Sequence, residues 1–267
     1  MGMAMEVIGA RATNPGAGPA ACAASTGDTL AIRSFDLATP AYLLNVWGQE
    51  ATAGFVQIRS PRLHDNVRGI RTRILAATTR AELGYDAVQH LYPQDTLTVE
   101  CAGGAAETDA FGMLIYYQDA PGMAARLATW EQVLPRIVQL LSIETTMVAP
   151  AVAGDWGAGV ALNAAATGDL TKANTDYAVL GYLTDTACTS VGIVGPDTGN
   201  VRVGGPGGIE PIETRDWFKD LARSTGMPCI PIINSANKGA TLVQQQNNAA
   251  AGTPIIDLMM AELRPVA

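Results

Sequence analysis

Two segments of this 267-residue chain repeat one pattern at an offset of 134 to 136 residues. They span residues 41–75 and 177–208, and each runs from an apolar stretch through a small-residue patch to a second, alternating apolar stretch. The landmarks that follow are a proline turn, Pro61 or Pro196, and the tripeptide Asn66–Arg68 or Asn200–Arg202. A repeat of about half the chain predicts two domains of the same design.

A second pair of segments follows the first in the same order. Residues 95–100 and 111–117 enclose a turn rich in Gly and Ala, as residues 240–244 and 254–260 enclose a turn rich in Asn, Ala and Gly. Each half is therefore predicted to close with a β-hairpin. The likeness is short, so chance is the competing explanation.

Composition limits the class of protein. A hydrophobic content of 48% and a mean hydropathy of +0.15 suffice to fill real cores. A net charge of −8 argues against bulk binding to nucleic acid or to anionic membranes. Lysine occurs only as Lys172, Lys219 and Lys238. This scarcity reflects either a GC-rich genome or surfaces buried in an assembly, because interfaces are depleted of lysine.

The cysteines and the N-terminal stretch point to no cofactor and no membrane. Cys22, Cys101, Cys188 and Cys229 lack paired spacing, which predicts buried thiols instead of a zinc site or a disulfide framework. No apolar run reaches the 18 residues of a membrane span. Residues 1–26, rich in small side chains, are predicted to form a flexible arm and not an export signal.

From Asp28 onward the chain reads as short strands separated by turns of Pro, Gly, Asp and Asn. The strands predicted in the first half are Thr29–Phe35, Tyr42–Trp47, Phe55–Arg59, Val67–Leu75, Thr96–Cys101 and Phe111–Tyr117. Residues 128–133 suit a helical turn that a strand follows. The clearest helix is Thr214–Ser224, with Thr214 as its N-cap and Gly226 as its stop.

Residues able to perform catalysis are sparse. The only histidines, His64 and His90, lie in predicted turns, where a local structural role is favoured over that of a general base. The glycine-rich run 204–208 lacks the Gly-Lys-Ser/Thr of a phosphate-binding loop. Asp169, Asn174 and Asp176 lack calcium-loop spacing. The expectation is a protein that is not an enzyme and holds no metal or cofactor; a hydrolase or isomerase with an unidentified site stays an alternative.

Six arginines form the one charge cluster: Arg59, Arg62, Arg68, Arg71, Arg73 and Arg80. On a strand, Arg71 and Arg73 share one face. Such a basic stripe is open to three interpretations: a solvated strand face, contact with a neighbouring subunit, or contact with nucleic acid. The candidate anchors of an interface are Trp47, Trp130 and Trp156, each of which could equally belong to a core.

Together these features predict a mainly β protein: an arm (1–26), two tandem β-sandwich, jelly-roll-like domains (27–145 and 146–267), and one short helix in the second. This arrangement resembles the double jelly-roll coat proteins of viruses and phages, although no signature motif makes the likeness specific. The resemblance implies a self-assembling capsid subunit that forms trimers or hexamers in an icosahedral-type shell. It also implies assembly in the host cytoplasm and location in the virion.

Further partners implied by the resemblance are other virion proteins and packaged nucleic acid. A different class remains open from the residues alone: a glycan-binding or receptor-binding β-sandwich of a spike, tail or cement protein. Its aromatic platform would come from Trp130, Trp156, Tyr116 and Tyr117.

Overall fold

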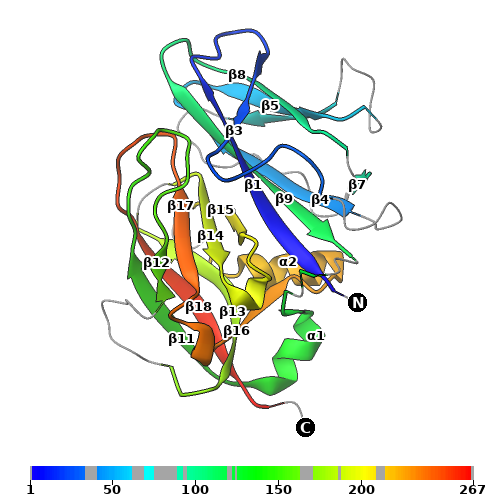
Figure 1. Ribbon diagram of the computed structural model, residues 1–267, viewed down its shortest axis with the longest axis vertical. Helices are drawn as coiled ribbons and strands as arrows, with labels where there is room; N and C mark the ends of the chain where they lie inside the picture. Colours follow the sequence, from blue (N-terminus) through cyan, green and yellow to red (C-terminus); the bar gives the residue numbers. More distant parts are fainter. Residues whose placement is uncertain are drawn as a thin grey trace.

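A computed structural model describes residues 2–33, 41–61, 69–74, 89–92, 95–118, 122–123, 125–162, 171–185, 188–208 and 214–265. The chain forms two β-sandwiches, one above the other in Figure 1, and the N-terminal strand runs from the upper lobe to the junction with the lower one. All strand pairs are antiparallel, as the turn-rich sequence predicts.

The first sandwich consists of two facing sheets with the strand orders β3-β1-β9-β4-β7 and β2-β8-β5-β6. The strands are β1 (Ala4–Thr13), β2 (Ala20–Ala21), β3 (Ala23–Ala24), β4 (Ala41–Gln49), β5 (Gly54–Arg59), β6 (Ile70–Ile74), β7 (Gln89–Leu91), β8 (Thr98–Ala102) and β9 (Thr108–Tyr117). Its core joins the inner faces of both sheets through residues such as Val46, Val56, Val99 and Met113.

The second sandwich repeats this plan with the strand orders β10-β16-β13-β18-β11 and β12-β17-β14-β15. The strands are β10 (Leu127–Ala128), β11 (Ile137–Thr146), β12 (Val160–Ala161), β13 (Asp176–Thr184), β14 (Ser190–Val194), β15 (Val203–Pro206), β16 (Ile230–Asn234), β17 (Leu242–Gln246) and β18 (Ile255–Leu263).

The predicted repeat is confirmed by topology. If β3 and β10 are set aside as additions at sheet edges, each domain has eight strands. Their order is first, eighth, third, sixth in one sheet and second, seventh, fourth, fifth in the other. This is the connectivity of a jelly roll. Even an irregularity recurs, because the pairing of β4 with β9 skips Leu44 and the pairing of β13 with β18 skips Leu180.

The prediction of a flexible N-terminal arm is wrong for most of that stretch. Residues 4–13 form β1, which pairs along its full length with β9. Met5, Val7 and Ile8 are all buried, because the strand lies between the core of the first domain and the surface of the second. The small side chains that suggested an arm allow this close packing.

The domain boundary also differs from the one predicted at residue 145. Strands β10 and β11 pair with β16 and β18, so residues 127–146 belong to the second sandwich. The reason lies in the repeat itself. β11 is the counterpart of β1, and both strands precede the segments in which the sequence repeat is visible.

Most predicted strands are present with shifted ends. Those predicted at 42–47, 55–59 and 111–117 fall within β4, β5 and β9, and the one at 96–101 begins two residues later, as β8. β6 covers 70–74 of the range 67–75, whose remaining residues lie outside the described parts except Gly69. In the described part of 29–35, only Ala31 pairs, with Thr96.

The two α-helices of the described residues lie where a helical turn (128–133) and a helix (214–224) were predicted. α1 (Trp130–Val133) begins with a capping box between Thr129 and Gln132. α2 (Trp217–Thr225) begins three residues after the predicted cap, because the hydroxyl of Thr214 donates to the carbonyl of Tyr182 instead. Single 3-10 turns lie at Leu134–Arg136, Pro196–Thr198 and Ser235–Asn237.

Candidate assembly interface

The first domain binds the second through a sheet that is buried on both faces. One face of β1, β9 and β4 covers the core of the first domain. The opposite face contributes Met5, Val7, Leu44, Leu114 and Tyr116 to the core of the second domain. This double burial explains why β9 is apolar almost throughout instead of alternating.

Trp47 is fully buried at this junction. Its Nε1 donates a hydrogen bond to the Ser190 hydroxyl over 2.9 Å. Its ring meets that of Trp217, at the start of α2, edge to face with centroids 6.1 Å apart. Gly205 leaves room for this arrangement, because a Cβ there would collide with the Trp217 indole. That contact explains why position 205 of the glycine-rich run is a glycine. The run contributes to β15 and is not a phosphate-binding loop.

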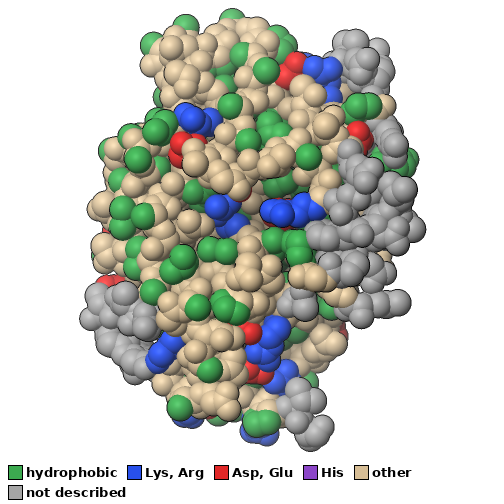
Figure 2. All heavy atoms as spheres, in the orientation of Figure 1, with side chains coloured by type: hydrophobic (Ala, Val, Ile, Leu, Met, Phe, Trp, Pro, Cys, Tyr) green, Lys and Arg blue, Asp and Glu red, His purple; other side chains and the backbone are tan. Residues whose placement is uncertain are grey.

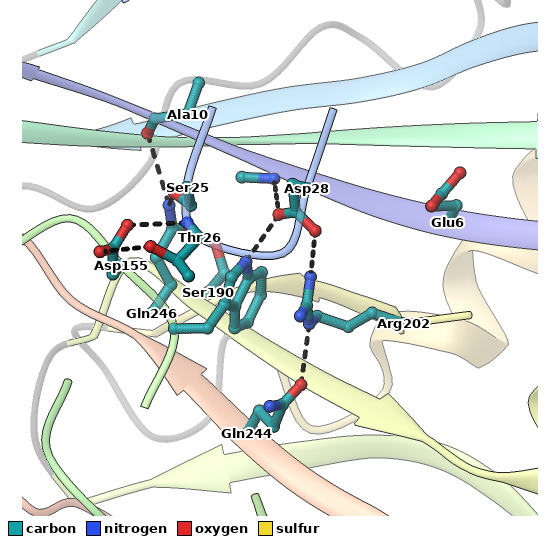
Figure 3. A network of polar contacts seen from close by, with 12 residues as sticks. Glu6, Ala10, Ser25, Thr26, Asp28, Asp155, Ser190, Arg202, Gln244 and Gln246 are labelled. Atoms are coloured by element: carbon teal, nitrogen blue, oxygen red, sulfur yellow. Dashed lines mark hydrogen bonds and ion pairs between the residues drawn. The ribbon is translucent and has the colours of Figure 1, made fainter. Parts of the chain in front are cut away.

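A polar network surrounds Asp28 at the same junction (Figure 3). One Asp28 carboxylate oxygen accepts from the backbone NH of Gly9 over 2.7 Å and from the Trp156 indole over 2.8 Å. The other forms an ion pair with Arg202. The Arg202 guanidinium also lies 4.0 Å from the centre of the Trp156 ring, a cation–π contact. Four residues from distant parts of the sequence thus form one buried cluster.

Gln246 provides a second link across the junction. Its side-chain nitrogen lies 3.1 Å from the carbonyl oxygen of Phe111, in the first domain, and 3.2 Å from that of Gly154, in the second. Thr26 adds two hydrogen bonds to the carboxylate of Asp155, both of 2.9 Å. Because these polar groups are satisfied across the junction, separating the domains would leave them without partners.

Two of the three predicted anchor tryptophans are not exposed. Trp47 is buried and Trp156 is only 8% exposed, both between domains of one chain, so neither is free for a neighbour or for a glycan platform. Tyr116 and Tyr117 are buried as well. Trp130 is partly buried and lines a groove on the outside of the second domain.

That groove lies on the outer face of the sheet that contains β11. Its volume is about 470 Å³, and its apolar lining includes Trp130, Leu140, Leu180 and Met259. Leu140 is 62% exposed and Val138 47% exposed. β11 is the last strand of its sheet, and no described strand pairs with its far edge. The sequence predicted a strand here but gave no sign that one apolar face would remain open.

The basic stripe is partly present. Arg71 and Arg73 are exposed on the outer face of β6, as predicted, and both guanidinium groups lie over the Phe55 ring. Arg71 also donates to the side-chain carbonyl of Gln57. Arg59 is instead paired with Glu100. Arg62, Arg68 and Arg80 lie outside the described residues.

The other candidate residues have structural contacts where the chain is described. His90 contacts the rings of Tyr42 and Tyr92, while His64 and Asp169 lie outside the described residues. Asp176 pairs with Arg126, and this partner lowers the pKa of the carboxyl. No described set of three or more His, Cys, Asp or Glu residues is arranged to hold a metal ion.

All four cysteines lie in described segments and are free thiols. Cys101, Cys188 and Cys229 are buried as predicted, and Cys22 is partly exposed. Burial raises the pKa of Cys188 and of Cys229 to about 12, so both are unreactive at neutral pH.

Two buried carboxylates stand out in the first domain. Glu50 follows β4 and Asp109 lies in β9; they are 1% and 0% exposed, and none of their carboxylate oxygens has a hydrogen-bond partner among the described residues. Burial, together with the nearby Asp109 and Glu107, raises the pKa of Glu50 to about 8. Burial and Glu107 raise the pKa of Asp109 to about 7.

The surface is sparsely charged. On the face drawn in Figure 2, charged side chains of the described residues occur singly or in small mixed groups among hydrophobic and uncharged ones. Within the described ranges, every helix is too short or too polar to cross a bilayer.

Comparison with known proteins identifies no family. No protein-family model and no curated protein matches the sequence. Among solved structures, the chain is similar to a cryo-EM structure of T=1 Penaeus vannamei nodavirus. The identity is 9%, 98% of each chain is covered, and the TM-score is 0.22, which is too low to carry an argument.

Proposed function

We propose that this protein is a structural, self-assembling subunit of a viral or phage coat, with no enzymatic activity. The observation that carries the proposal is the tandem arrangement of two jelly rolls of identical strand order that are fused through a buried interface. Jelly rolls serve widely as capsid domains. A fused pair supplies two shell-building units from one chain.

The exposed features agree with assembly better than with ligand binding. Leu134, Val138 and Leu140 leave apolar area in water beside a groove, and such surfaces mark interaction sites. The buried polar network at the junction fixes the angle between the domains, which a subunit of a regular shell requires. Trimers that place six similar jelly rolls around one axis are the arrangement we expect, as in the double jelly-roll coat proteins that the sequence resembles.

Electron microscopy of the purified chain across a range of concentrations and ionic strengths tests this role. We expect closed particles or regular ring-shaped capsomers. A single monomeric species at high concentration under all conditions would contradict the proposal.

A further inference from the structure

The contact between the two domains predicts how chains meet one another. Within the chain, the face of β1, β9 and β4 binds the side of the second domain formed by β17, β14 and β15. In the repeat, β11, β18 and β13 of the second domain correspond to β1, β9 and β4 of the first. In the same way, β8, β5 and β6 of the first domain correspond to β17, β14 and β15 of the second. The two counterpart faces lie at opposite ends of the stacked sheets (Figure 1), and neither packs against another described sheet of the chain. On the β13 side of its face, Trp130 of α1 and the start of α2 border the groove, and the part around β11 stays open.

The counterpart positions keep an apolar character. Leu44, the residue skipped in the β4 bulge, is buried between the domains, and its counterpart Leu180 lines the open groove. By the same strand registers, Met5 corresponds to Leu140 and Leu114 to Met259. These three positions of the open face therefore carry apolar side chains where the first domain uses its own to bind, and Val7 corresponds to the polar Ser142.

Charge distinguishes the open face from the occupied one. Glu144 on β11 lies directly opposite Asp257 on β18, and like charges opposite one another destabilise a sheet. Within the described parts, no Lys or Arg forms an ion pair with either carboxylate. Burial and the nearby Asp185 raise the pKa of Asp257, as expected for a carboxylate that lacks a cation.

The opposite end of the molecule carries the complementary charge. Arg71 and Arg73 project from the outer face of β6, which is the counterpart of β15, and both are exposed. Phe55 beneath them is only 8% exposed, so its ring supports the two guanidinium groups from below. The end of this face that carries Glu144 and Asp257 thus has a matching pair of guanidinium groups on a second copy of the chain. Arg215 and Lys219 lie at the groove beside α2.

We propose that the outer face of the second domain, around Leu140, Glu144 and Asp257, binds the outer face of the first domain, around Arg71 and Arg73, of a second copy. The contact repeats between chains the sheet arrangement that joins the domains within one chain. This inference rests on the proposed self-association and names its surfaces. Since the two faces differ, the association is head to tail, and it closes into a ring where the rotation between copies allows.

Sedimentation velocity of three variants tests the pairing of faces. Leu140→Asp alters the second-domain face, and the double variant Arg71→Glu, Arg73→Glu alters the first-domain face. The matched control is Arg223→Glu, a charge reversal of an exposed residue on α2. Each substituted side chain is exposed, and melting temperatures measured beside the wild type separate a loss of association from a loss of stability, since Arg71 also contacts Gln57 and Phe55.

We expect the wild type and Arg223→Glu to form the same oligomers. Both face variants are expected to associate roughly tenfold more weakly or worse, as for the loss of paired interface groups. Oligomers that persist unchanged in both face variants would overturn this pairing and leave the coat role standing. A wild type that stays monomeric at every concentration would overturn both.

Discussion

The indole of Trp47, in the first domain, donates a hydrogen bond to the hydroxyl of Ser190, in the second, across 2.9 Å. Ser190 in turn donates to the side-chain oxygen of Gln246 over 2.7 Å. The three residues come from β4, β14 and β17, so two sheets of different domains share one chain of hydrogen bonds. We therefore expect the domains to unfold as a unit.

Replacement of Trp47 by Ala is expected to break this cooperativity. The variant loses a fully buried ring and its contact with Trp217, which costs about 3–5 kcal/mol of unfolding free energy. Urea unfolding followed by far-UV circular dichroism and by tryptophan fluorescence measures the effect. Two separate transitions are expected in place of one. Trp47→Phe keeps most of the volume and loses about 0.5–1.5 kcal/mol with the hydrogen bond.

Arg202→Ala is expected to destabilise the protein far more than removal of a cation whose carboxylate partner is exposed. The variant leaves Asp28, whose side chain is 6% exposed, charged and without its cation, at a cost of about 3–5 kcal/mol. The control is Lys219→Ala, which removes the surface pair with Asp216 and costs about 0–1 kcal/mol. Equal losses in the two variants, measured by urea titration, would show that the junction does not depend on the Asp28 cluster.

Glu50 and Asp109 are expected to make stability fall as the pH rises. Their pKa values of about 8 and 7 lie above the ordinary carboxyl values near ~4, so the native state binds more protons than the unfolded state between these limits. Their contribution is complete below about pH 4 and is lost as the pH passes through the native pKa values. Asp176, whose pKa is lowered, makes stability rise with pH instead, but only at pH values below its ordinary pKa.

The test compares Glu50→Gln with the wild type at pH 5.5 and pH 8.5 by urea unfolding. We expect Glu50→Gln to be the more stable protein at pH 8.5 and to show a smaller fall between the two pH values. The matched control is Asp185→Asn. Asp185 directly follows β13, as Glu50 directly follows β4, but the Asp185 carboxylate accepts a hydrogen bond from the Ile255 NH. A wild type whose stability is flat over this range would contradict the prediction.

Removal of residues 2–13 distinguishes a structural strand from an arm. The deletion removes β1, leaving β9 without its neighbour and the second-domain surface uncovered. We expect an insoluble or molten product, recognised by loss of the near-UV circular dichroism signal and by binding of a hydrophobic dye. A soluble, fully folded product that only fails to assemble would restore the arm interpretation.

The sequence predicted the mainly β fold and the tandem repeat because both rest on local patterns. Alternating apolar residues define β5 and β6, and landmarks such as Pro61 and Pro196 recur at one offset. The part that could not be predicted depends on contacts between distant segments. β1 has the small residues of a flexible arm, and its role as a strand follows from the partners on both of its sides.

The candidate interface shows the same limit. The pairing of Arg71 and Arg73 on one face follows from strand periodicity and was predictable. The burial of Trp47 was not, because periodicity places it on the outer face of its sheet and only the second domain covers that face. The Asp28 cluster was missed for a similar reason: Asp28 and Arg202 are 174 residues apart, and the members of the cluster share no motif.

The most direct test of head-to-tail association is to mix the two face variants. Leu140→Asp retains an intact first-domain face, and the Arg71→Glu, Arg73→Glu variant retains an intact second-domain face. If the two faces bind each other, each variant alone is monomeric, and a 1:1 mixture forms a heterodimer that grows no further, as native mass spectrometry would show. A mixture that contains only monomers, or variants that form ordered oligomers on their own, would contradict the account.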